Sequence, residues 1–426
     1  MQNSTPPGTD APLAPTDTTP LLDDPYAAYA ALREAGPVHR ITGPDGHPAW
    51  LVTRYDDVRR ALADPRLSLD KRNALPGGYR GFSLPPALDA NLLNMDPPDH
   101  TRIRRLVAKA FTPRRVEALR EPVRRLAEEL LDAIEPNGRA DLISAYAAPL
   151  SIIVICDLLG VAERDRVDFR AWSDALITPD PSRPHLMKEA IVAMMGYFTG
   201  LIAAKRAEPG DDLLSDLIAV RGEAGERGDA SGDGGSATGA TGATGADRLS
   251  EDELTSLAFL LLFAGYENTT HLIGNSVLAL LDHPDQLREM RGNPAELGPA
   301  VEEFARFDGP SALAIRRFPL KDVEIGGVRI PAGESVLLSL TSANHDPDRF
   351  DAPQKLDPAR EVSGHLMFGH GIHYCLGAPL ARMETETALA ALISRFAGLR
   401  LEVPRAELRH RRTIRARGLI SLPVAW

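Results

Sequence analysis

A ten-residue stretch, FGHGIHYCLG, runs from Phe368 to Gly377 and places Cys375 directly before a long segment with apolar periodicity. Gly371 and Gly377 let the backbone turn tightly and approach a flat ligand closely, which a residue carrying a Cβ would resist. The next segment, LGAPLARMETETALAALISRF, has the apolar spacing of a helix. We therefore expect the cysteine at a helix N-terminus, where unpaired N–H groups favour a thiolate at neutral pH. Such a sulfur is suited to binding a metal.

Cys375 could have several roles. Zinc needs several clustered ligands, and the second cysteine, Cys156, lies far away in the apolar run LSIIVICDLLG, which is typical of a protein core. A disulfide is disfavoured because the chain carries no secretory signal. A nucleophilic cysteine paired with His373 stays open, although no third orienting group is nearby. A haem iron, which accepts a single thiolate, fits the whole ten-residue pattern.

Bulk properties narrow the class of protein. The formal charge of −11 and the pI near 5.5 argue against nucleic acid or an anionic membrane as the main partner. No apolar run approaches a membrane span, and the polar segment 1–20 has no signal-peptide pattern, so we expect a disordered tail and a cytoplasmic protein. Residues 21–426 are predicted to form one domain. Within it, residues 221–247 are rich in Gly, Ala and Thr and predict a flexible surface insertion.

A long helix is predicted after that insertion. Ser250 and Glu253 form an S-x-x-E capping signature, and Pro284 limits the helix to about Asp282, which gives roughly 45 Å at 1.5 Å per residue. The polar stretch 265–270 interrupts its apolar sequence, which lowers helix propensity and risks burying unpaired polar groups. A polar neighbour is one explanation. The other is a locally bent helix whose side chains bond to backbone carbonyls.

The loop FGHGIHYCLGAPLAR resembles the cysteine-ligand loop of the cytochrome P450 family, of the soluble bacterial kind. Further segments that resemble the family occur in its order between residues 95 and 377: MDPPDHTRIRRLVAKAFTPRRV, AGYENTT, EEFAR, DVEIGGVRIPAGE, ANHDPDRF and LDPAR. The resemblance implies a mainly α fold with small β-sheets, a triangular helical prism that encloses one haem. It also implies haem b with Cys375 as the axial ligand of the iron.

The resemblance implies further contacts with the haem. It places Ala264 and Gly265 over the haem face and Phe368 in the cysteine loop. The propionates, which are anionic, need cationic or hydrogen-bonding partners, and the family positions for these carry His100, Arg104, Arg317 and His373. The resemblance also implies a buried pair of Glu303 and Arg306, joined by Arg360, that supports the cysteine loop without taking part in catalysis.

The residues implied to guide protons to oxygen are Glu267, Asn268 and Thr269. Here the sequence departs from the family, because the residue after the acid is usually Thr and is Asn268 in this chain. A hydroxyl can donate a hydrogen bond and relay a proton, whereas an amide donates but relays poorly. Three hypotheses follow: Asn268 holds a water that relays the proton, a hydroxyl of the substrate helps, or the reaction needs little control of oxygen-bond scission.

The function implied by the resemblance is reductive activation of O2 with electrons from NAD(P)H through a ferredoxin reductase and a ferredoxin. A basic cluster could dock the ferredoxin or could simply be solvated surface charge; it consists of Arg102, Arg105, Lys109, Arg114 and Arg115. The products would be hydroxylated or epoxidised hydrophobic molecules, as in polyketide or macrolide antibiotic biosynthesis. Residues implied to contact the substrate are Leu93, Asn94, Leu176, Ala264, Leu313 and Ala314. Oxidative coupling without oxygen insertion and a non-catalytic haem sensor are the alternatives.

Overall fold

The computed structural model describes residues 16–79, 85–89, 91–177, 183, 185–220 and 248–426. The predicted insertion at 221–247 and most of the predicted tail lie outside these ranges. The prediction of a disordered tail is wrong for residues 16–20, because Thr16 N donates to Arg40 O at 2.7 Å and a short helix begins at Thr19. Leu21 in that helix is buried, so this part of the chain is held by the core.

Helices form most of the described chain, as the sequence predicts. The α-helices are α1 (Thr19–Asp23), α2 (Pro25–Ala35), α3 (Tyr55–Ala63), α4 (Pro86–Asp89), α5 (Asp99–Ala110), α6 (Pro113–Ala118), α7 (Arg120–Ile134), α8 (Ala148–Leu159), α9 (Arg166–Ile177), α10 (His185–Ala207), α11 (Leu213–Ala219), α12 (Glu251–Asp282), α13 (Pro284–Gly292), α14 (Leu297–Asp308), α15 (Leu340–Asn344) and α16 (Ala378–Arg395).

The strands are short and form small sheets. They are β1 (Val38–Thr42), β2 (Pro48–Val52), β3 (Leu67–Ser68), β4 (Arg139–Asp141), β5 (Phe318–Pro319), β6 (Val323–Ile325), β7 (Val328–Ile330), β8 (Val336–Leu338), β9 (Arg400–Leu401) and β10 (Pro423–Ala425). In the order β1-β2-β8, the first pair is antiparallel and the second parallel. A second sheet has the order β4-β10-β9, and β3 pairs with β5 and β6 with β7.

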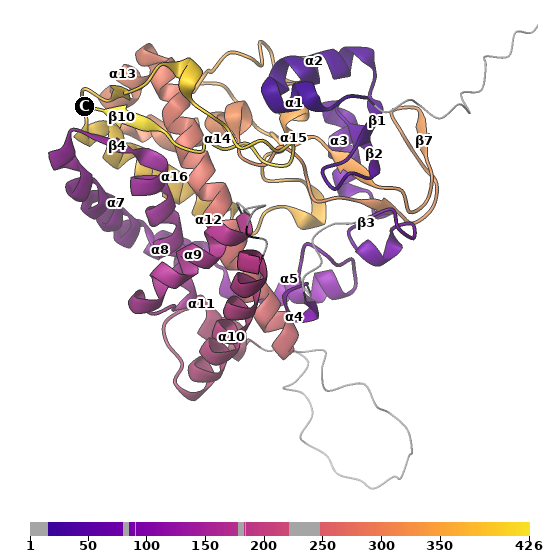
Figure 1. Cartoon of the computed structure of the whole chain (residues 1–426), viewed down its shortest axis with the longest axis horizontal. Helices are drawn as coiled ribbons and strands as arrows, with labels where there is room; N and C mark the ends of the chain where they lie inside the picture. Colours follow the sequence, from indigo (N-terminus) through magenta and orange to yellow (C-terminus); the bar gives the residue numbers. More distant parts are fainter. Residues whose placement is uncertain (1–15, 80–84, 90, 178–182, 184, 221–247) are drawn as a thin grey trace, which may run out of the picture.

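Helix α12 is the long helix that the capping signature predicts. The Ser250 side chain accepts from Glu253 N, and the Glu253 side chain accepts from Ser250 N, so the capping box is complete. The helix ends at Asp282, before Pro284, as expected. Figure 1 shows α12 crossing the body of the molecule, with α7 to α11 on one side and α1 to α3 on the other. It packs against α4, α8, α10, α14 and α16, which makes it the centre of the largest hydrophobic core cluster.

One described helix contradicts the expectation that no apolar run approaches a membrane span. Helix α10 is long and apolar enough to cross a membrane by length and composition alone. A mostly buried core helix passes the same test, and one face of α10 is buried through Ala190, Met194, Phe198 and Ile202. That face packs against α9, α11 and α12, and 22% of the most apolar 18-residue window of α10 is buried inside the protein.

Candidate functional site

The cysteine loop returns to α16 through a tight turn. Cys375 N donates to Phe368 O at 2.8 Å, and a single 3₁₀ turn spans Gly371–His373. Gly371 has φ +75°, and a Cβ there would lie 3.2 Å from the backbone of α3, so glycine is required at this position. Gly377 has φ −80°, which any residue adopts. The backbone conformation therefore requires glycine at Gly371 but not at Gly377, where a Cβ would lie 3.9 Å from the Cys375 sulfur. That these glycines let a flat ligand approach closely stays a prediction.

The Cys375 thiol lies three residues before α16, and the N–H groups of Gly377 and Ala378 lower its pKa. Burial has the larger effect and raises the pKa of Cys375 above its ordinary value. The helix terminus therefore acts in the predicted direction, but burial opposes it. The Cys375 side chain is nevertheless exposed. The sulfur is therefore accessible to a ligand although its surroundings are partly desolvated.

Four side chains predicted to hold anionic groups gather beside that cysteine. The His100 and His373 rings lie 4.1 Å apart between centroids, and Arg104 donates to the carbonyl of Tyr374 at 2.6 Å. Burial, followed by the neighbouring Arg317, lowers the pKa of His373 to about 3. Helix α5 presents His100 together with its buried apolar residues Ile103, Leu106, Val107 and Ala110.

Unpaired donors in this group test whether it fits an anionic ligand. Among the described residues, His100 Nε2 and the Nε and Nη1 atoms of Arg317 are buried without a hydrogen-bond partner. Burial lowers the pKa of Arg317 to about 10, so the guanidinium is charged at neutral pH. Buried donors without partners cost free energy, and a dianionic carboxylate ligand would satisfy them. The residues present therefore fit the propionates of a haem.

Two polar side chains of α12 bond to carbonyls of their own helix, which is part of one of the two explanations that the sequence left open. Thr270 Oγ1 donates to Tyr266 O at 2.8 Å and Asn268 Nδ2 donates to Ala264 O at 3.3 Å, so two side chains bond to the helix's own carbonyls. Thr269 is buried. A Cβ at Gly265 would lie 3.0 Å from a side chain of α8, so its small size allows α8 to pack closely.

Asn268 also has a partner outside the helix that the sequence did not reveal. Ser311 Oγ donates to Asn268 Oδ1 at 3.3 Å, and Ser311 N contacts the Met367 sulfur at 3.3 Å. The amide oxygen and one N–H of Asn268 are thus engaged, which leaves its second N–H as a donor. Ser311 lies 43 residues away in the chain, so no local pattern could have identified it.

Glu267 faces a basic segment near the C-terminus. Its carboxylate lies 3.7 Å from Arg411 Nη1. Burial raises the pKa of Glu267, and Arg411 and Arg415 partly oppose that shift. A half-buried carboxyl with a raised pKa can take up and release a proton near neutral pH more readily than an ordinary glutamate. The basic sequence HRRTIRARG could have suggested the partner, but only the fold brings it to α12.

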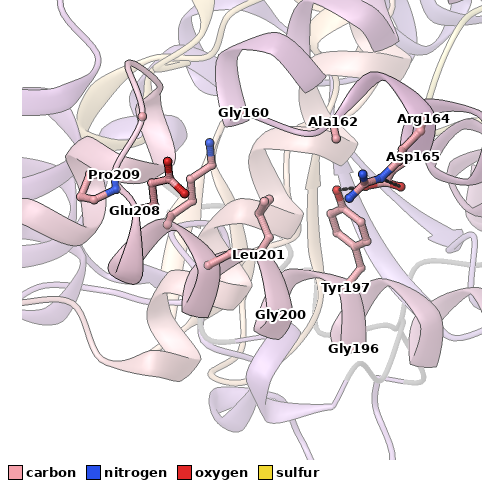
Figure 2. A pocket seen from close by; sticks show the side chains of 13 residues that line it. Gly160, Ala162, Arg164, Asp165, Gly196, Tyr197, Gly200, Leu201, Glu208 and Pro209 are labelled. Carbon is pink, nitrogen blue, oxygen red and sulfur yellow. Dashed lines mark hydrogen bonds and ion pairs between the residues drawn. The ribbon is translucent and has the colours of Figure 1, made fainter.

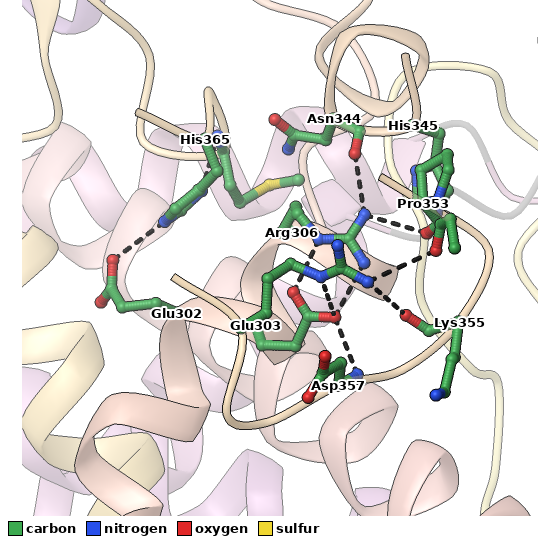
Figure 3. Close-up of polar contacts among 12 residues, drawn as sticks. Glu302, Glu303, Arg306, Asn344, His345, Pro353, Lys355, Asp357 and His365 are labelled. Atoms are coloured by element: carbon green, nitrogen blue, oxygen red, sulfur yellow. Dashed lines mark hydrogen bonds and ion pairs between the residues drawn. The ribbon is translucent and has the colours of Figure 1, made fainter. Parts of the chain in front are cut away.

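The predicted pair of Glu303 and Arg306 is fully buried. Arg306 Nε and Nη2 contact the two Glu303 oxygens at 2.6 and 2.8 Å, and Arg360 Nε approaches Glu303 at 3.4 Å. Arg306 also donates to Asn344 O at 2.9 Å (Figure 3). Asn344 Oδ1 accepts from Leu366 N at 2.7 Å, at the start of the cysteine loop. The pair therefore supports that loop, as the resemblance implies.

A second polar group, which the sequence did not predict, lies beside the cysteine loop and consists of Glu302, His365 and Arg382. Glu302 accepts from His365 at 2.9 Å and from Arg382 (Figure 3 shows Glu302 and His365). Arg382 also donates to the Tyr374 hydroxyl at 3.1 Å and stacks over Phe368. Burial alone would raise the pKa of Glu302, but these hydrogen bonds lower it to about 2. The loop is thus held from α14 and α16.

Neither of the two cavities described contains the predicted substrate contacts. One, of about 620 Å³, lies between the 160–165 segment and α10 and is lined by Tyr197 and Leu201 (Figure 2). The other, of about 410 Å³, is lined by Glu302, His365 and Tyr374 beside the cysteine loop.

The six predicted substrate contacts lie on four segments, namely 93–94, α9, α12 and 313–314. Leu176 and Leu313 are buried in different core clusters. Asn94 uses its amide to bond Asp89. Leu93, Ala264 and Ala314 are partly buried. That these residues share one pocket stays a prediction.

The predicted basic cluster is only partly available to a partner. Arg102 is paired with Glu253, and Arg115 lies 2.7 Å from Asp216. Arg105 and Arg114 are exposed.

Cys156 is fully buried, and burial raises its pKa to about 12, which confirms its role as a core residue. Within the described ranges, no group of three or more His, Cys, Asp or Glu side chains is placed so that it could hold a metal ion.

Comparison with known proteins identifies relatives over almost the entire chain. A family model described as Cytochrome P450 matches residues 297–412. The chain is 44% identical to "Cytochrome P450 monooxygenase PikC" of Streptomyces venezuelae over 96% of this chain and 95% of that protein. It is 40% identical to "Mycinamicin IV hydroxylase/epoxidase" of Micromonospora griseorubida, over 93% and 94% of the two chains.

Solved structures show the same likeness in three dimensions. The ligand-free P450 monooxygenase TamI aligns with a TM-score of 0.84 and 42% identity, over 97% of this chain and 94% of that chain. The Bacillus subtilis cytochrome P450 PksS also aligns with a TM-score of 0.84, at 35% identity, over 95% and 97% of the two chains. The helices and small sheets described above are therefore arranged as in these proteins.

Proposed function

The chain belongs to the cytochrome P450 family and is a monooxygenase; on that premise we propose that it hydroxylates or epoxidises a bulky, mostly hydrophobic molecule of the polyketide or macrolide type. The observation that carries the proposal is the position of Cys375. Its thiol is accessible, although neighbouring groups partly desolvate it, and it lies near buried donors of His100 and Arg317 that have no hydrogen-bond partner among the described residues. That combination suits one metal-bound macrocycle with anionic substituents.

The residues that would hold haem b are those of the cysteine loop and the donors around it. Cys375 would supply the thiolate, and metal binding would displace the thiol proton that burial otherwise retains. His100, Arg104, Arg317 and His373 would bind the propionates, and Phe368 and Ala264 would border the macrocycle. Haem ligated by a thiolate supplies the reductive activation of O2 and the transfer of one oxygen atom to the substrate.

The polar residues of α12 would manage protons at the site. Asn268 can donate one N–H toward a bound oxygen or substrate group, since Ala264 and Ser311 occupy the rest of its amide. It cannot pass that proton on without forming an unstable amide anion. Glu267, whose pKa is raised by burial, would be the group that exchanges protons. The apolar residues of α12 around this stretch exclude bulk water.

Replacement of each cysteine tests ligation with a matched control. Cys375→Ser should abolish the thiolate-type spectrum of the reduced carbon monoxide complex. Cys156→Ser, in the core, should retain it. A thiolate-type spectrum in Cys375→Ser, or its absence from the parent protein supplied with haem, would refute the proposal.

The substrate class is supported by the relatives, two of which are named "Mycinamicin IV hydroxylase/epoxidase" and "Polyketide biosynthesis cytochrome P450 PksS". A panel of macrolactones, linear polyketides and small terpenes should give ligand-induced spin shifts only with the bulky members. Strong shifts with small terpenes alone would refute the size class. Product mass distinguishes oxygen insertion, which adds one oxygen atom, from coupling, which removes hydrogen.

Electrons would come from NAD(P)H through a ferredoxin reductase and a ferredoxin, docked at the exposed Arg105 and Arg114. Cytoplasmic location is part of this proposal and is supported by the two free cysteines, which are typical of reducing compartments. Arg105→Glu with Arg114→Glu should slow reduction by an acidic ferredoxin and weaken its salt dependence. Arg288→Glu should not, because Arg288 is exposed on α13, a helix that Figure 1 shows well away from α5. Equal rates for both variants would refute this docking surface.

Oxidative coupling is the second candidate, and Asn268 favours it. A reaction that inserts no oxygen places less demand on a hydroxyl relay, and Asn268 offers none. Asn268→Thr should raise the product formed per NAD(P)H consumed if oxygen insertion is the reaction and proton delivery limits it. Unchanged yield with a product two hydrogens lighter than the substrate would support coupling.

A further inference from the structure

The side-chain amide of Asn268 is held from two directions. Asn268 Nδ2 donates to Ala264 O at 3.3 Å, one turn earlier in α12, and Asn268 Oδ1 accepts from Ser311 Oγ at 3.3 Å. An amide has a donor end and an acceptor end, and the Ala264 carbonyl can only accept. Turning the amide by 180° would bring its oxygen against that carbonyl, with no proton between the two acceptors. The two contacts therefore favour the same orientation of the amide.

Ser311 is fixed by the backbone around it. Ser311 forms an isolated antiparallel β-bridge with Ala416, and its N–H contacts the Met367 sulfur at 3.3 Å. In the same bridge region, Arg417 N donates to Pro310 O at 2.7 Å. Because the backbone is anchored on both sides, only rotation about its own side chain is left to the hydroxyl. The hydroxyl therefore meets the Asn268 amide from a set position.

Asn268 lies on an accessible face of α12, although the helix crosses the core. Leu261, Ala264, Gly265 and Asn268 recur at helical spacing on one face, and all four are partly buried. Every residue from Thr269 to Leu280 is buried. A ligand that reaches the accessible face meets the amide, whose two contacts leave the second N–H of Nδ2 as a donor.

We propose that Ser311 is a positioning residue, which holds the Asn268 amide so that it offers a donor and no acceptor to a ligand on this face of α12. The matching ligand group is an oxygen with lone pairs, such as a carbonyl, ether or hydroxyl oxygen of the substrate, or dioxygen. Ser311 acts through the amide and not on the ligand. The inference rests on the proposed function, since only there does this face of α12 border the reacting atoms.

The first test compares Ser311→Ala with Ser311→Thr, which keeps the hydroxyl and suits the extended backbone of a β-bridge. The readout is the infrared C–O stretch of the reduced carbon monoxide complex, whose frequency falls beside a donor and rises beside a lone pair. The parent protein and Ser311→Thr should show one main band. In Ser311→Ala a band at higher frequency should grow, and the ratio of the main band to it should fall roughly two- to tenfold, as expected for one neutral hydrogen bond.

The second test shows whether Ser311 acts through the amide. In an Asn268→Ala background, Ser311→Ala should change neither the C–O band nor the product formed per NAD(P)H, because the group that Ser311 positions is gone. With Asn268 present, the same substitution should lower the product per NAD(P)H by roughly two- to tenfold. Ser276→Ala is the matched control, because it removes a hydroxyl that donates to Leu272 O at 2.6 Å on the same helix, and it should leave the band unchanged.

Two results would overturn the inference. One is an unchanged C–O band in Ser311→Ala, and the other is an equal shift with and without Asn268, which would indicate a structural role for Ser311. Either result in a protein with a normal thiolate-type spectrum refutes the role of Ser311 alone. A parent protein without that spectrum refutes the proposed function itself.

Discussion

Replacing Arg306 with Met removes the most completely buried ion pair described in the protein while keeping a side chain of similar length. Both members of the pair have fully buried side chains. The change leaves the Glu303 carboxylate with the backbone N–H of Asp357 at 3.0 Å and with Arg360 at 3.4 Å. It also removes donors from the carbonyls of Asn344 and Pro353.

The expected cost follows from the uncompensated charge. Removing one partner of a buried pair typically destabilises a protein by about 3–5 kcal/mol, since the remaining charge stays desolvated. Unfolding entropy is about 2.1 cal/mol/K per residue, or roughly 0.9 kcal/mol/K for 426 residues. The unfolding temperature of Arg306→Met should therefore fall by about 3–6 °C.

The assay is thermal unfolding of the haem-loaded protein, followed by circular dichroism and by loss of the thiolate-type spectrum. Arg288→Met is the matched control, because Arg288 pairs with Asp285 at the same i, i+3 spacing but both side chains are largely exposed. Exposed pairs contribute about 0–1 kcal/mol, so the control should move by about 1 °C or less. Equal shifts in the two variants would refute the reasoning that burial makes the Arg306 pair essential.

Three further predictions concern the cysteine loop and its surroundings. Arg317→Leu should weaken haem retention roughly 10- to 100-fold, because a charged donor to a propionate contributes about 1.5–3 kcal/mol; unchanged retention in a haem-transfer assay would contradict this. The folded pKa of Glu302, about 2, is below its ordinary value of 4.5, so its stabilisation is complete above about pH 4.5 and declines as pH falls toward 2. The difference in unfolding temperature between the parent and Arg382→Gln should shrink below pH 4.5, and a pH-independent difference would count against the assignment. Gly371→Ala should destabilise the protein by about 1–2 kcal/mol because of its left-handed backbone, and by more because the new Cβ would contact α3. Gly77→Ala, at φ +71° with open space around it, should show only the backbone effect. Equal unfolding temperatures for the two variants would exclude a cost from the contact with α3.

Features that depend on neighbours in the chain were predicted well. The bounds of α12 followed from Ser250, Glu253 and Pro284, because capping and the missing N–H of proline act over one turn. The burial of Cys156 followed from the apolar residues around it. The resemblance placed the Glu303, Arg306 and Arg360 network correctly, since its motifs mark positions that the fold brings together.

Features that depend on the balance of long-range effects were not predictable in the same way. The helix terminus does lower the pKa of Cys375, but burial outweighs it, and burial is a property of the whole protein. The partner of Asn268 is Ser311, and the neighbour of Glu267 comes from the C-terminal segment. These segments meet only after the core has formed.

The amino-acid sequence by itself determined the family, the single candidate metal ligand and the central helix, because each was identified from short motifs of consecutive residues. Tertiary structure alone decided the electrostatics of the thiol and the hydrogen bonds of the Asn268 amide. The physical reason is that desolvation and hydrogen-bond partnership depend on distances across the folded chain, whereas capping, turn geometry and apolar periodicity depend on a few consecutive residues.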